Sequence, residues 1–305
     1  MKNPVRSRLR AAVALTVGAT LVALGASACG TVERTDAARA PAASPTLDKT
    51  LRGLLPERVL QTGVLRVGTD AAYPPMSSFG PDGRTIVGME PDLGAALGRV
   101  LGIKLEFVHM EFSSILPQVR DGVIDVGIAA MTDTAEREKQ VDFVNYLSAG
   151  TSILVQRGNP SAISDLADLC GKTVALEQGT IQVDLVRRAQ PNCGTNPIKL
   201  ATYPTNSDAL VQLRTGRANA VLNDFAPAAF LTTDARTKAH YQLASTTQYE
   251  PGQYGVAVNK SQPAIRDALA GALSALDHDG TYKRILDHWG VSAGAVDDVT
   301  VNSGS

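Results

Sequence analysis

Two matching stretches of sequence decide the fold: LPQVRDGVIDVGI at residues 116–128, and LVQLRTGRANAVL at residues 210–222, 94 residues further along the chain. Each reads as the end of a helix, a glycine that stops the helix (Gly122 and Gly216), a polar residue and an apolar strand. A generic helix–strand unit could produce one such match by chance. As an internal repeat, the pattern indicates two similar α/β lobes rather than one sheet.

The segments around the first stretch alternate between strand and helix patterns. In chain order, we expect a strand at 64–68, a helix at 90–101, a strand at 104–108, a helix from Ser113 and a strand at 123–130. A last long helix is predicted at 263–276, and the small polar residues after Trp289 predict a disordered tail at 291–305. Strands that alternate with helices imply a mostly parallel sheet with covered faces.

The chain begins with an export signal. Four basic residues within the first ten precede an uncharged stretch that runs to Ala28 and leads directly to Cys29. This segment resembles a bacterial lipoprotein signal, in which the cysteine is lipidated, although Ala26 stands where that motif usually carries Leu. An ordinary signal peptide or an uncleaved membrane anchor are the alternatives. We expect residues 1–28 to be the signal peptide and residues 29–54 to be a flexible, lipid-anchored linker.

Two cysteines, an even number, remain available for pairing if Cys29 is lipidated. Cys170 and Cys193 would then face an oxidising compartment. A disulfide between them would close a loop of 24 residues and stabilise the fold by roughly 3 kcal/mol. Two buried, reduced thiols are the alternative.

The overall charge excludes a nucleic-acid partner. The chain has 29 basic and 30 acidic residues, a net charge of −1, and no long basic run follows the first ten residues. The four histidines are scattered without the spacing of metal ligands, and no phosphate-binding, dinucleotide-binding or nucleophile motif is present. We therefore expect no metal, no cofactor and no catalytic residue.

Polar residues stand where predicted strands give way to helices. Arg137 follows a buried strand and could grip a carboxylate, Thr180 begins a helix whose free N–H groups favour an anion, and Asp224 ends an apolar strand and could bind an ammonium. Each has a plainer interpretation: a solvated arginine behind an Asp133–Glu136 cap, or a simple helix cap. Because ligands of open α/β sheets bind beyond the carboxyl ends of strands, these positions are candidate walls of one cleft.

Several short motifs then occur in a family-specific order. They are Gly88-Met-Glu-Pro-Asp-Leu93, Phe112-Ser-Ser-Ile-Leu-Pro117, Gly122-Val-Ile-Asp125, Met131-Thr-Asp-Thr-Ala-Glu-Arg137, Val141-Asp-Phe143, Gln178-Gly-Thr180 and Asp279-Gly-Thr-Tyr282. On these motifs the chain, over about residues 55 to 290, is identified as a member of extracellular solute-binding protein family 3, the polar amino-acid-binding proteins of ABC importers. Met89 and Pro91 depart from the family's usual signature.

This resemblance implies a periplasmic-binding-protein fold of type II-like topology, in which two α/β lobes joined by two hinge crossings close on a ligand. The crossings are expected near residues 150–154 and 255–258. Lobe one would then comprise residues 55–150 and 257–290, and lobe two residues 153–254. Both Cys170 and Cys193 would lie in lobe two, so their bond would not restrain closure.

The resemblance also assigns a ligand site. Arg137, with Thr132 and Thr180 beside it, matches the residues that bind the ligand α-carboxylate, and Asp224 matches the carboxylate that binds the α-ammonium. Ala130 stands where relatives often have Ser or Gly, which puts one hydrogen bond to the carboxylate in question.

Selectivity for the ligand side chain is expected to rest on five further positions. These are Asp70, Tyr73, Phe112, Glu177 and Gln182. Asp70 and Tyr73 match positions that hold a cationic side chain in relatives, and Phe112 matches an aromatic wall. Two acids without a matching base favour arginine, lysine or ornithine over glutamine, which stays possible.

The resulting hypothesis is a monomeric, lipid-anchored receptor on the outer face of the cell membrane that delivers an amino acid to an ABC permease. An exported cyclohexadienyl dehydratase-like enzyme, with Glu177 as general acid, is the alternative. A signalling module is a third. The presence of both Arg137 and Asp224 favours an amino acid as the ligand.

Overall fold

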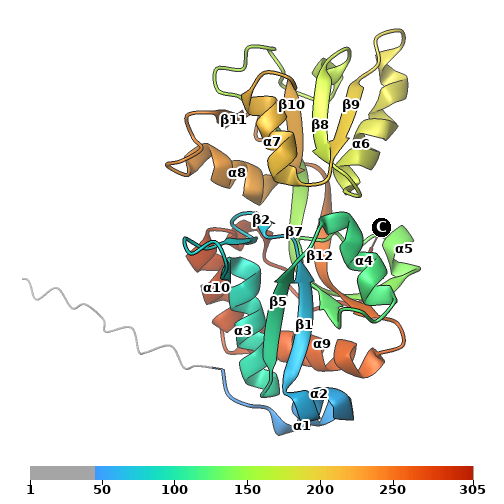
Figure 1. Ribbon diagram of the computed structural model, residues 1–305, viewed down its shortest axis with the longest axis vertical. Helices are drawn as coiled ribbons and strands as arrows, with labels where there is room; N and C mark the ends of the chain where they lie inside the picture. The colour runs from blue at the N-terminus through green and yellow to red at the C-terminus, as the bar shows by residue number, and fades with distance from the viewer. Residues whose placement is uncertain (1–44, 305) are drawn as a thin grey trace, which may run out of the picture. The chain divides into compact units, whose positions relative to one another are not determined.

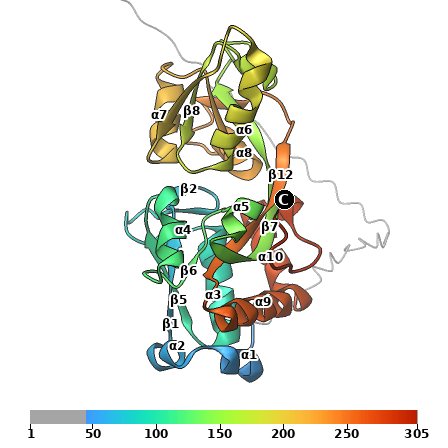
Figure 2. The ribbon, with the colours of Figure 1, turned by 90° about the vertical axis from the view of Figure 1, so that its right-hand side faces the viewer.

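Two long antiparallel strands run through both halves of the protein: β7 (Val141–Gln156) and β12 (Tyr249–Asn259). The computed structural model describes residues 45–304, and it places one α/β lobe on each side of a waist that these strands cross (Figures 1 and 2). The predicted two-lobed fold is therefore confirmed. The strands form a mixed sheet in the order β5-β1-β6-β12-β7-β10-β8-β9, and β11 pairs with β7.

Lobe one holds the parallel strands β1 (Val64–Thr69), β5 (Lys104–His109) and β6 (Val126–Gly127). Its helices are α1 (Lys49–Leu54), α2 (Glu57–Thr62), α3 (Met89–Leu101), α4 (Phe112–Arg120), α5 (Ala135–Glu138), α9 (Pro263–His278) and α10 (Thr281–Trp289). A small antiparallel sheet of β2 (Ala72–Tyr73), β3 (Ser77–Phe79) and β4 (Ile86–Val87) lies at its upper edge in Figure 1.

Lobe two is built from the strands β8 (Thr173–Glu177), β9 (Lys199–Tyr203), β10 (Ala220–Asp224) and β11 (Tyr241–Leu243). Its helices are α6 (Ile181–Ala189), α7 (Asn206–Arg214) and α8 (Phe225–Thr233), with short 3-10 turns at Ala167–Leu169 and Gln190–Cys193. A further 3-10 turn, Ser292–Gly294, follows α10 in lobe one.

The internal repeat seen in the sequence is a structural repeat. In lobe one α4 leads through Gly122 to β6, and in lobe two α7 leads through Gly216 to β10; both glycines have φ of 72°. The polar residue of each stretch performs the same task, because Asp125 accepts the backbone N–H of Arg66 at 2.8 Å and Asn219 accepts that of Thr173 at 2.9 Å. Each bond ties the repeated strand to the first strand of its lobe. The repeated strand of lobe one, β6, is far shorter than the predicted 123–130.

Each lobe has hydrophobic clusters of its own. In lobe one, α3 and α9 pack their apolar faces over the sheet, and the α9 face predicted from the sequence is fully buried. In lobe two, separate clusters cover the two faces of β8 and β10. Because these clusters of the described residues are largely confined to one lobe each, the lobes are suited to move as two rigid bodies about the crossing strands.

The start of the fold lies earlier than predicted. The N-terminal helix α1 is capped by Asp48, whose side chain accepts the N–H groups of Thr50 at 2.8 Å and Leu51 at 3.0 Å. Leu51 packs against Gly271 of α9, and Arg52 donates to the carbonyl of Leu101. The predicted linker 29–54 is thus wrong at its C-terminal end. The predicted signal peptide 1–28 and the lipidated Cys29 lie outside the described residues.

The tail and the second hinge crossing also differ from prediction. Residues 291–304, expected to be disordered, pack on lobe one through a short pairing of Val301 with Val144. The strand β12 crosses between Tyr249 and Gly252 rather than at 255–258, because its later residues are buried in the core of lobe one. Gly255 permits close packing against Phe143 rather than hinge movement.

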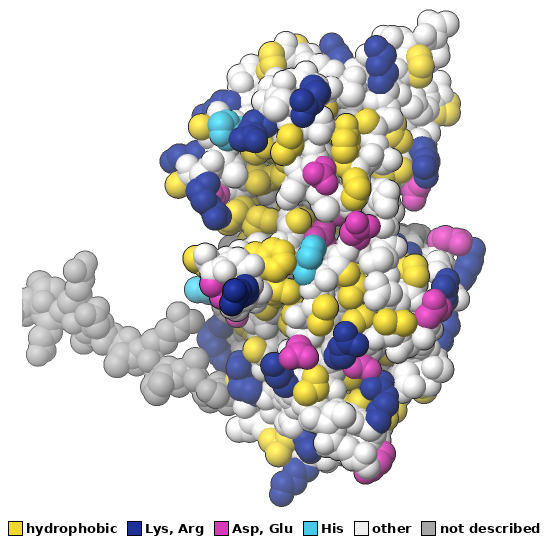
Figure 3. Space-filling model, viewed as in Figure 1, with side chains coloured by type: hydrophobic (Ala, Val, Ile, Leu, Met, Phe, Trp, Pro, Cys, Tyr) yellow, Lys and Arg dark blue, Asp and Glu magenta, His cyan; other side chains and the backbone are white. Residues whose placement is uncertain are grey.

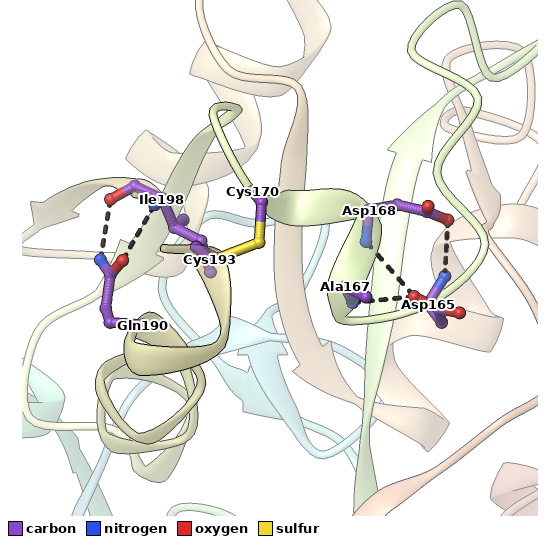
Figure 4. The surroundings of a disulfide bond; sticks show 7 residues. All are labelled: Asp165, Ala167, Asp168, Cys170, Gln190, Cys193 and Ile198. Atoms are coloured by element: carbon purple, nitrogen blue, oxygen red, sulfur yellow. Dashed lines mark hydrogen bonds between the residues drawn. A yellow bond between two sulfur atoms is a disulfide. The ribbon is translucent and has the colours of Figure 1, made fainter. Parts of the chain in front are cut away.

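The disulfide between Cys170 and Cys193 is present and braces lobe two (Figure 4), with an S–S length of 2.04 Å. It joins two surface turns on the same lobe, so it leaves the waist free. Gln190 supports the second turn by exchanging hydrogen bonds with the backbone of Ile198 at 2.8 and 2.9 Å. Across residues 45–304, no helix combines the length and apolar character needed to cross a membrane.

Candidate ligand-binding site

A cavity lies between the lobes, and all ten site residues predicted from the sequence line it. Its lining consists of Asp70, Tyr73, Phe112, Ala129, Ala130, Thr132, Arg137, Glu177, Thr180, Ile181, Gln182, Asn206, Leu222, Asn223 and Asp224. Figure 3 shows acidic side chains and a histidine gathered where the two lobes meet.

The topology explains why these residues meet. Asp70 follows β1, Thr132 follows β6, Glu177 ends β8 and Asp224 ends β10. Parallel strands of one lobe end at the same edge, and the crossing strands turn these edges of the two lobes toward each other. Residues more than 150 positions apart are therefore brought into one site.

Arg137 is buried at the lobe-one wall. Its guanidinium donates to the carbonyl of Thr132 at 2.6 Å and, across the waist, to the carbonyl of Gly179 at 3.0 Å. It lies 5.5 Å from the ring centre of Phe112. Burial lowers the pKa of Arg137 to about 10, so it remains a cation at neutral pH. The interpretation of Arg137 as a solvated residue behind an Asp133 cap is wrong, because Thr134 caps α5.

Asp224 faces Arg137 from lobe two and is held by two donors. The hydroxyl of Tyr73 donates to Oδ2 at 2.8 Å and the amide of Gln182 donates to Oδ1 at 2.9 Å. Burial raises the pKa of Asp224 to about 6, against the lowering effect of these bonds and of Arg137. Burial and Asp224 raise the pKa of Tyr73, which stays a neutral donor. Tyr73 thus links the lobes and supports Asp224, a role that the sequence did not indicate.

At the other end of the cavity, the carboxyl groups of Asp70 and Glu177 meet across the waist. Both residues are buried, and within the described residues no N–H or O–H group donates to Asp70 Oδ2 or Glu177 Oε1. The two carboxyl groups can share a hydrogen bond once one of them carries a proton. Burial and the proximity of Asp70 raise the pKa of Glu177 to about 10, and burial raises the pKa of Asp70. His109 lies 3.7 Å from Asp70 at the edge of the cavity. The pair therefore holds a proton at neutral pH and lacks a basic partner inside the lining.

Thr180 stands at the start of α6 but does not act as a side-chain cap. Its hydroxyl donates instead to the carbonyl of Glu177 at 2.8 Å. This bond tightens the turn between β8 and α6, so that the helix N-terminus points into the cavity lining together with Ile181 and Gln182.

A family model described as bacterial extracellular solute-binding proteins, family 3, matches residues 65–292. The chain belongs to this family. The arginine-binding protein ArgT of Corynebacterium glutamicum is 31% identical over 256 residues, which cover 83% of this chain and 82% of ArgT.

Two solved structures have the same fold. A solved ancestral arginine-binding protein, bound to arginine, superposes with a TM-score of 0.69 at 36% identity and covers 74% of this chain and 98% of its own. The ancestral amino acid-binding protein AncCDT-1, described as a precursor of cyclohexadienyl dehydratase, gives a TM-score of 0.68 at 31% identity, covering 79% and 99%.

Five lining residues of this family 3 protein were not predicted. They are Ala129, Ile181, Asn206, Leu222 and Asn223. Asn206 and Asn223 lie at the carboxyl ends of β9 and β10, a position that could have identified them. The three apolar residues carry no sequence signal, since an apolar residue beside a strand end is most often core.

A buried glutamate supports the site from behind, and the sequence did not reveal it. Glu90 accepts the backbone N–H of Ala130 and the hydroxyl of Tyr146, both at 2.5 Å, and the hydroxyl of Ser77 at 2.6 Å. Ala130 has a φ of 48°, which is unfavourable for any residue with a Cβ. Glu90 thus helps to hold the turn that leads to Thr132.

Proposed function

We propose that this family 3 protein is the substrate-binding component of an amino-acid ABC importer, with arginine as its preferred ligand. The observation that carries the proposal is one cavity with two chemically distinct ends. Arg137 and Asp224 offer opposite charges at one end, and the carboxyls of Asp70 and Glu177 stand at the other, with His109 3.7 Å from Asp70 but outside the lining. Arginine has complementary groups for both ends.

The first end matches the ionised backbone of a free amino acid. The guanidinium of Arg137, with Thr132 and the N-terminus of α6 at Thr180, would bind the α-carboxylate. Asp224 would bind the α-ammonium while Tyr73 and Gln182 hold its carboxylate in place. In the closed form these partners fix the orientation of both charged groups, which would limit the reorganisation that opposes binding.

The second end matches a cationic side chain. A guanidinium presents several N–H donors to the two orphan oxygens of Asp70 and Glu177, and Phe112 supplies a wall for the stem. A cation entering here replaces the proton that the pair holds in its absence. The relatives named for arginine support this ligand class.

Closure of the lobes would couple the two ends. The hydrogen bonds that cross the waist include Tyr73 to Asp224 at 2.8 Å, Arg137 to Gly179 at 3.0 Å, and Gln178 to Ser113 at 3.1 Å. Because Arg137 and Asp224 lie on opposite lobes, a ligand that engages both favours the closed form over the open form. The closed receptor would then be recognised by the permease.

Anchoring and delivery complete the proposal. Cys29 would carry a lipid that holds the monomeric protein at the outer face of the membrane, beside its permease. Intact-mass measurement of membrane-extracted protein would show the mass of the lipid on a chain that begins at residue 29. A chain cleaved elsewhere, or without added mass, would refute the anchor.

The ligand is tested by thermal-shift and calorimetric titration of the chain from residue 30 onward, which contains every described residue. Arginine should bind and raise the unfolding midpoint by mass action. Citrulline is the matched control, because it has nearly the shape of arginine but no side-chain charge. Binding of citrulline or glutamate as tight as that of arginine would refute the cationic preference.

One observation favours a second candidate, a dehydratase on this fold. The pKa of Glu177 near 10 keeps the group protonated at neutral pH, as a general acid requires. Turnover of prephenate or arogenate, lost in Glu177→Gln, together with no binding of any amino acid, would establish the enzyme and refute the receptor. The pairing of Arg137 with Asp224 supports the receptor instead.

A further inference from the structure

The last residues of the chain, Thr300–Gly304, form a short segment that we call the C-terminal strap. It runs along β7, and its last described residue, Gly304, lies beside α5 (Figures 1 and 2). The backbone of Asn145 donates to the carbonyl of Thr300 at 3.0 Å, and the backbone of Asn302 donates to the carbonyl of Phe143 at 3.1 Å. The strap therefore adds strand-like pairing to the edge of β7.

Asn302 anchors the strap to the buried carboxylate of Asp142, which pairs with two partly exposed cations. Its side chain accepts the N–H of Phe143 at 2.8 Å and donates to Asp142 at 3.0 Å. Asp142 also pairs with Lys260 at 3.0 Å and Arg266 at 2.9 Å. A charged cluster with several partners makes a firm attachment point, so the two residues after Asn302 are held in place.

Those two residues contact the segment that carries Arg137. The backbone N–H of Ser303 donates to Asp133 Oδ2 at 2.9 Å, and that of Gly304 donates to Glu138 Oε1 at 2.7 Å. The approach at Gly304 is close, because a Cβ there would lie 2.7 Å from Asp133 Oδ1. The strap thus bonds to the segment on both sides of Arg137.

This segment has little internal support. The helix α5 has only four residues, and an isolated turn of helix is unstable in water. Yet Arg137 must hold a fixed direction, since its guanidinium reaches back to the carbonyl of Thr132 in the cavity wall. Fixing Asp133 and Glu138 from outside fixes the backbone that aims Arg137 inward.

The strap also meets the crossing strands. Gln253 of β12 accepts the hydroxyls of Thr300 at 2.9 Å and Ser303 at 2.7 Å, and its carbonyl accepts the N–H of Asp133 at 2.7 Å. Asn145 of β7 donates to both Asp133 at 3.0 Å and Ser303 at 2.6 Å. Strap, Arg137 segment and hinge strands therefore form one hydrogen-bonded unit close to the waist.

We propose that the C-terminal strap is a positioning element for Arg137, which it holds in the orientation that receives the carboxylate of the ligand. The inference rests on the proposed binding of an amino acid. Among the described residues, none of the strap lines the cavity, so its effect on binding would act through Asp133 and Glu138, both directly and by way of Gln253 and Asn145.

The experiment removes Ser303–Ser305 and leaves Asn302 in place. The truncation removes five hydrogen bonds of Ser303 and Gly304, which join them to Asp133, Glu138, Gln253, Asn145 and Thr300. It should weaken arginine binding by about threefold to tenfold, since only part of their energy affects the bound orientation of Arg137. The matched control is Lys260→Ala, which weakens the same Asp142 network but leaves Ser303 and Gly304 intact. It should lower the unfolding midpoint without changing the arginine dissociation constant.

Agmatine, which is arginine without its carboxylate, separates positioning from general stability. The truncation should leave the weaker binding of agmatine unchanged, so the ratio of arginine to agmatine affinity falls by the same factor. An unchanged ratio overturns the proposal, even where both affinities fall together.

Hydrogen exchange of the ligand-free protein tests the positioning role without any ligand. Its result can therefore be separated from a failure of the proposed function. The amides of residues 133–138 should exchange faster in the truncated chain than in the intact chain or in Lys260→Ala. If the intact protein binds no amino acid, the proposed function fails while faster exchange still supports the positioning role. Equal exchange rates refute that role whatever the ligand.

Discussion

The two ends of the cavity differ in how their charged groups are paired. At the Arg137 end, each charge has protein partners: Arg137 has two carbonyls, and Asp224 has Tyr73 and Gln182. At the Asp70–Glu177 end, two buried carboxyl groups face each other, and one oxygen of each accepts no N–H or O–H donor within residues 45–304. In the closed form the protein itself supplies the partners of the first end, and we propose that a ligand would supply those of the second.

This difference teaches how one site can combine high affinity for an amino acid with selectivity for its side chain. Every free amino acid has the same backbone charges, so a preorganised end can bind all of them. A buried carboxyl pair is costly unless a cation or a proton neutralises it, so this end discriminates among side chains. Four predictions test the contrast, beginning with the largest effect.

Removing a charge at the organised end should abolish binding. In Arg137→Met or Asp224→Asn, the opposite charge of the ligand would be buried without its partner, which costs about 3 kcal/mol or more and weakens arginine binding by more than about a hundredfold. Calorimetric titration measures the loss, and far-ultraviolet circular dichroism controls for the fold. Arginine affinity within a few-fold of the unchanged protein would contradict the assigned role.

Neutralising a carboxyl group at the Asp70–Glu177 end should change the selectivity for the ligand side chain more than the affinity for the α-amino and α-carboxylate groups of the ligand. In Asp70→Asn, arginine binding should weaken by about tenfold to thirtyfold, as expected for a partly buried charge pair, while citrulline binding should be unchanged or tighter. The ratio of the two dissociation constants is the measured quantity. Equal loss for both ligands would show that Asp70 serves the fold rather than selectivity.

The raised pKa of Glu177 predicts a pH dependence of stability. The folded, ligand-free protein keeps a proton on Glu177 up to a pKa of about 10, whereas the unfolded chain loses it near the ordinary value for glutamate. The free energy of unfolding should therefore fall as pH rises from about 6 to 9, by at most about 1.4 kcal/mol per pH unit.

Glu177→Gln is the matched variant, because it keeps the shape and cannot titrate. Its stability should vary less with pH, as measured by denaturant titrations across the same range. The same proton should be released when arginine binds, which calorimetry in buffers of different ionisation enthalpy detects. Identical slopes in both proteins, and no proton release, would show that the carboxyl pair holds no proton.

The smallest effect concerns the support of the organised end. Ala130→Gly should raise the free energy of unfolding by up to about 1 kcal/mol, because glycine adopts the left-handed φ of 48° without strain. The N–H bond to Glu90 is retained, so arginine affinity should be unchanged. A loss of stability would mean that the entropy cost of glycine outweighs the strain at this turn.

Much of the fold was predictable because its signals are local. The helices α3 and α9 follow from apolar periodicity, and the glycines that end α3 and α4 mark their bounds. The repeat predicted two lobes, since Asp125 and Asn219 repeat one tie between strands. The ten predicted lining residues all reach the cavity, because strand ends converge once the topology is known.

The wrong predictions concern segments that are stabilised by packing against parts of the chain distant in sequence. The helix α1 is six residues long and gains its support from α3 and α9 rather than from its own sequence. The strap has a polar sequence typical of disorder, yet it is ordered by bonds to Asp142, Asp133 and Glu138. Such partners are distant in sequence, so composition alone predicts a tail.

The sequence by itself determined the family, the two α/β lobes and ten of the fifteen described residues that line the cavity, because short motifs and periodic apolar faces encode them locally. Only the tertiary structure decided how those residues are paired. Tyr73 donates to Asp224, Asp70 meets Glu177 across the waist, and Ser303 bonds to the segment that carries Arg137. Each of these depends on groups more than 100 positions apart, whose contacts follow from packing the two lobes together and leave no trace in local sequence.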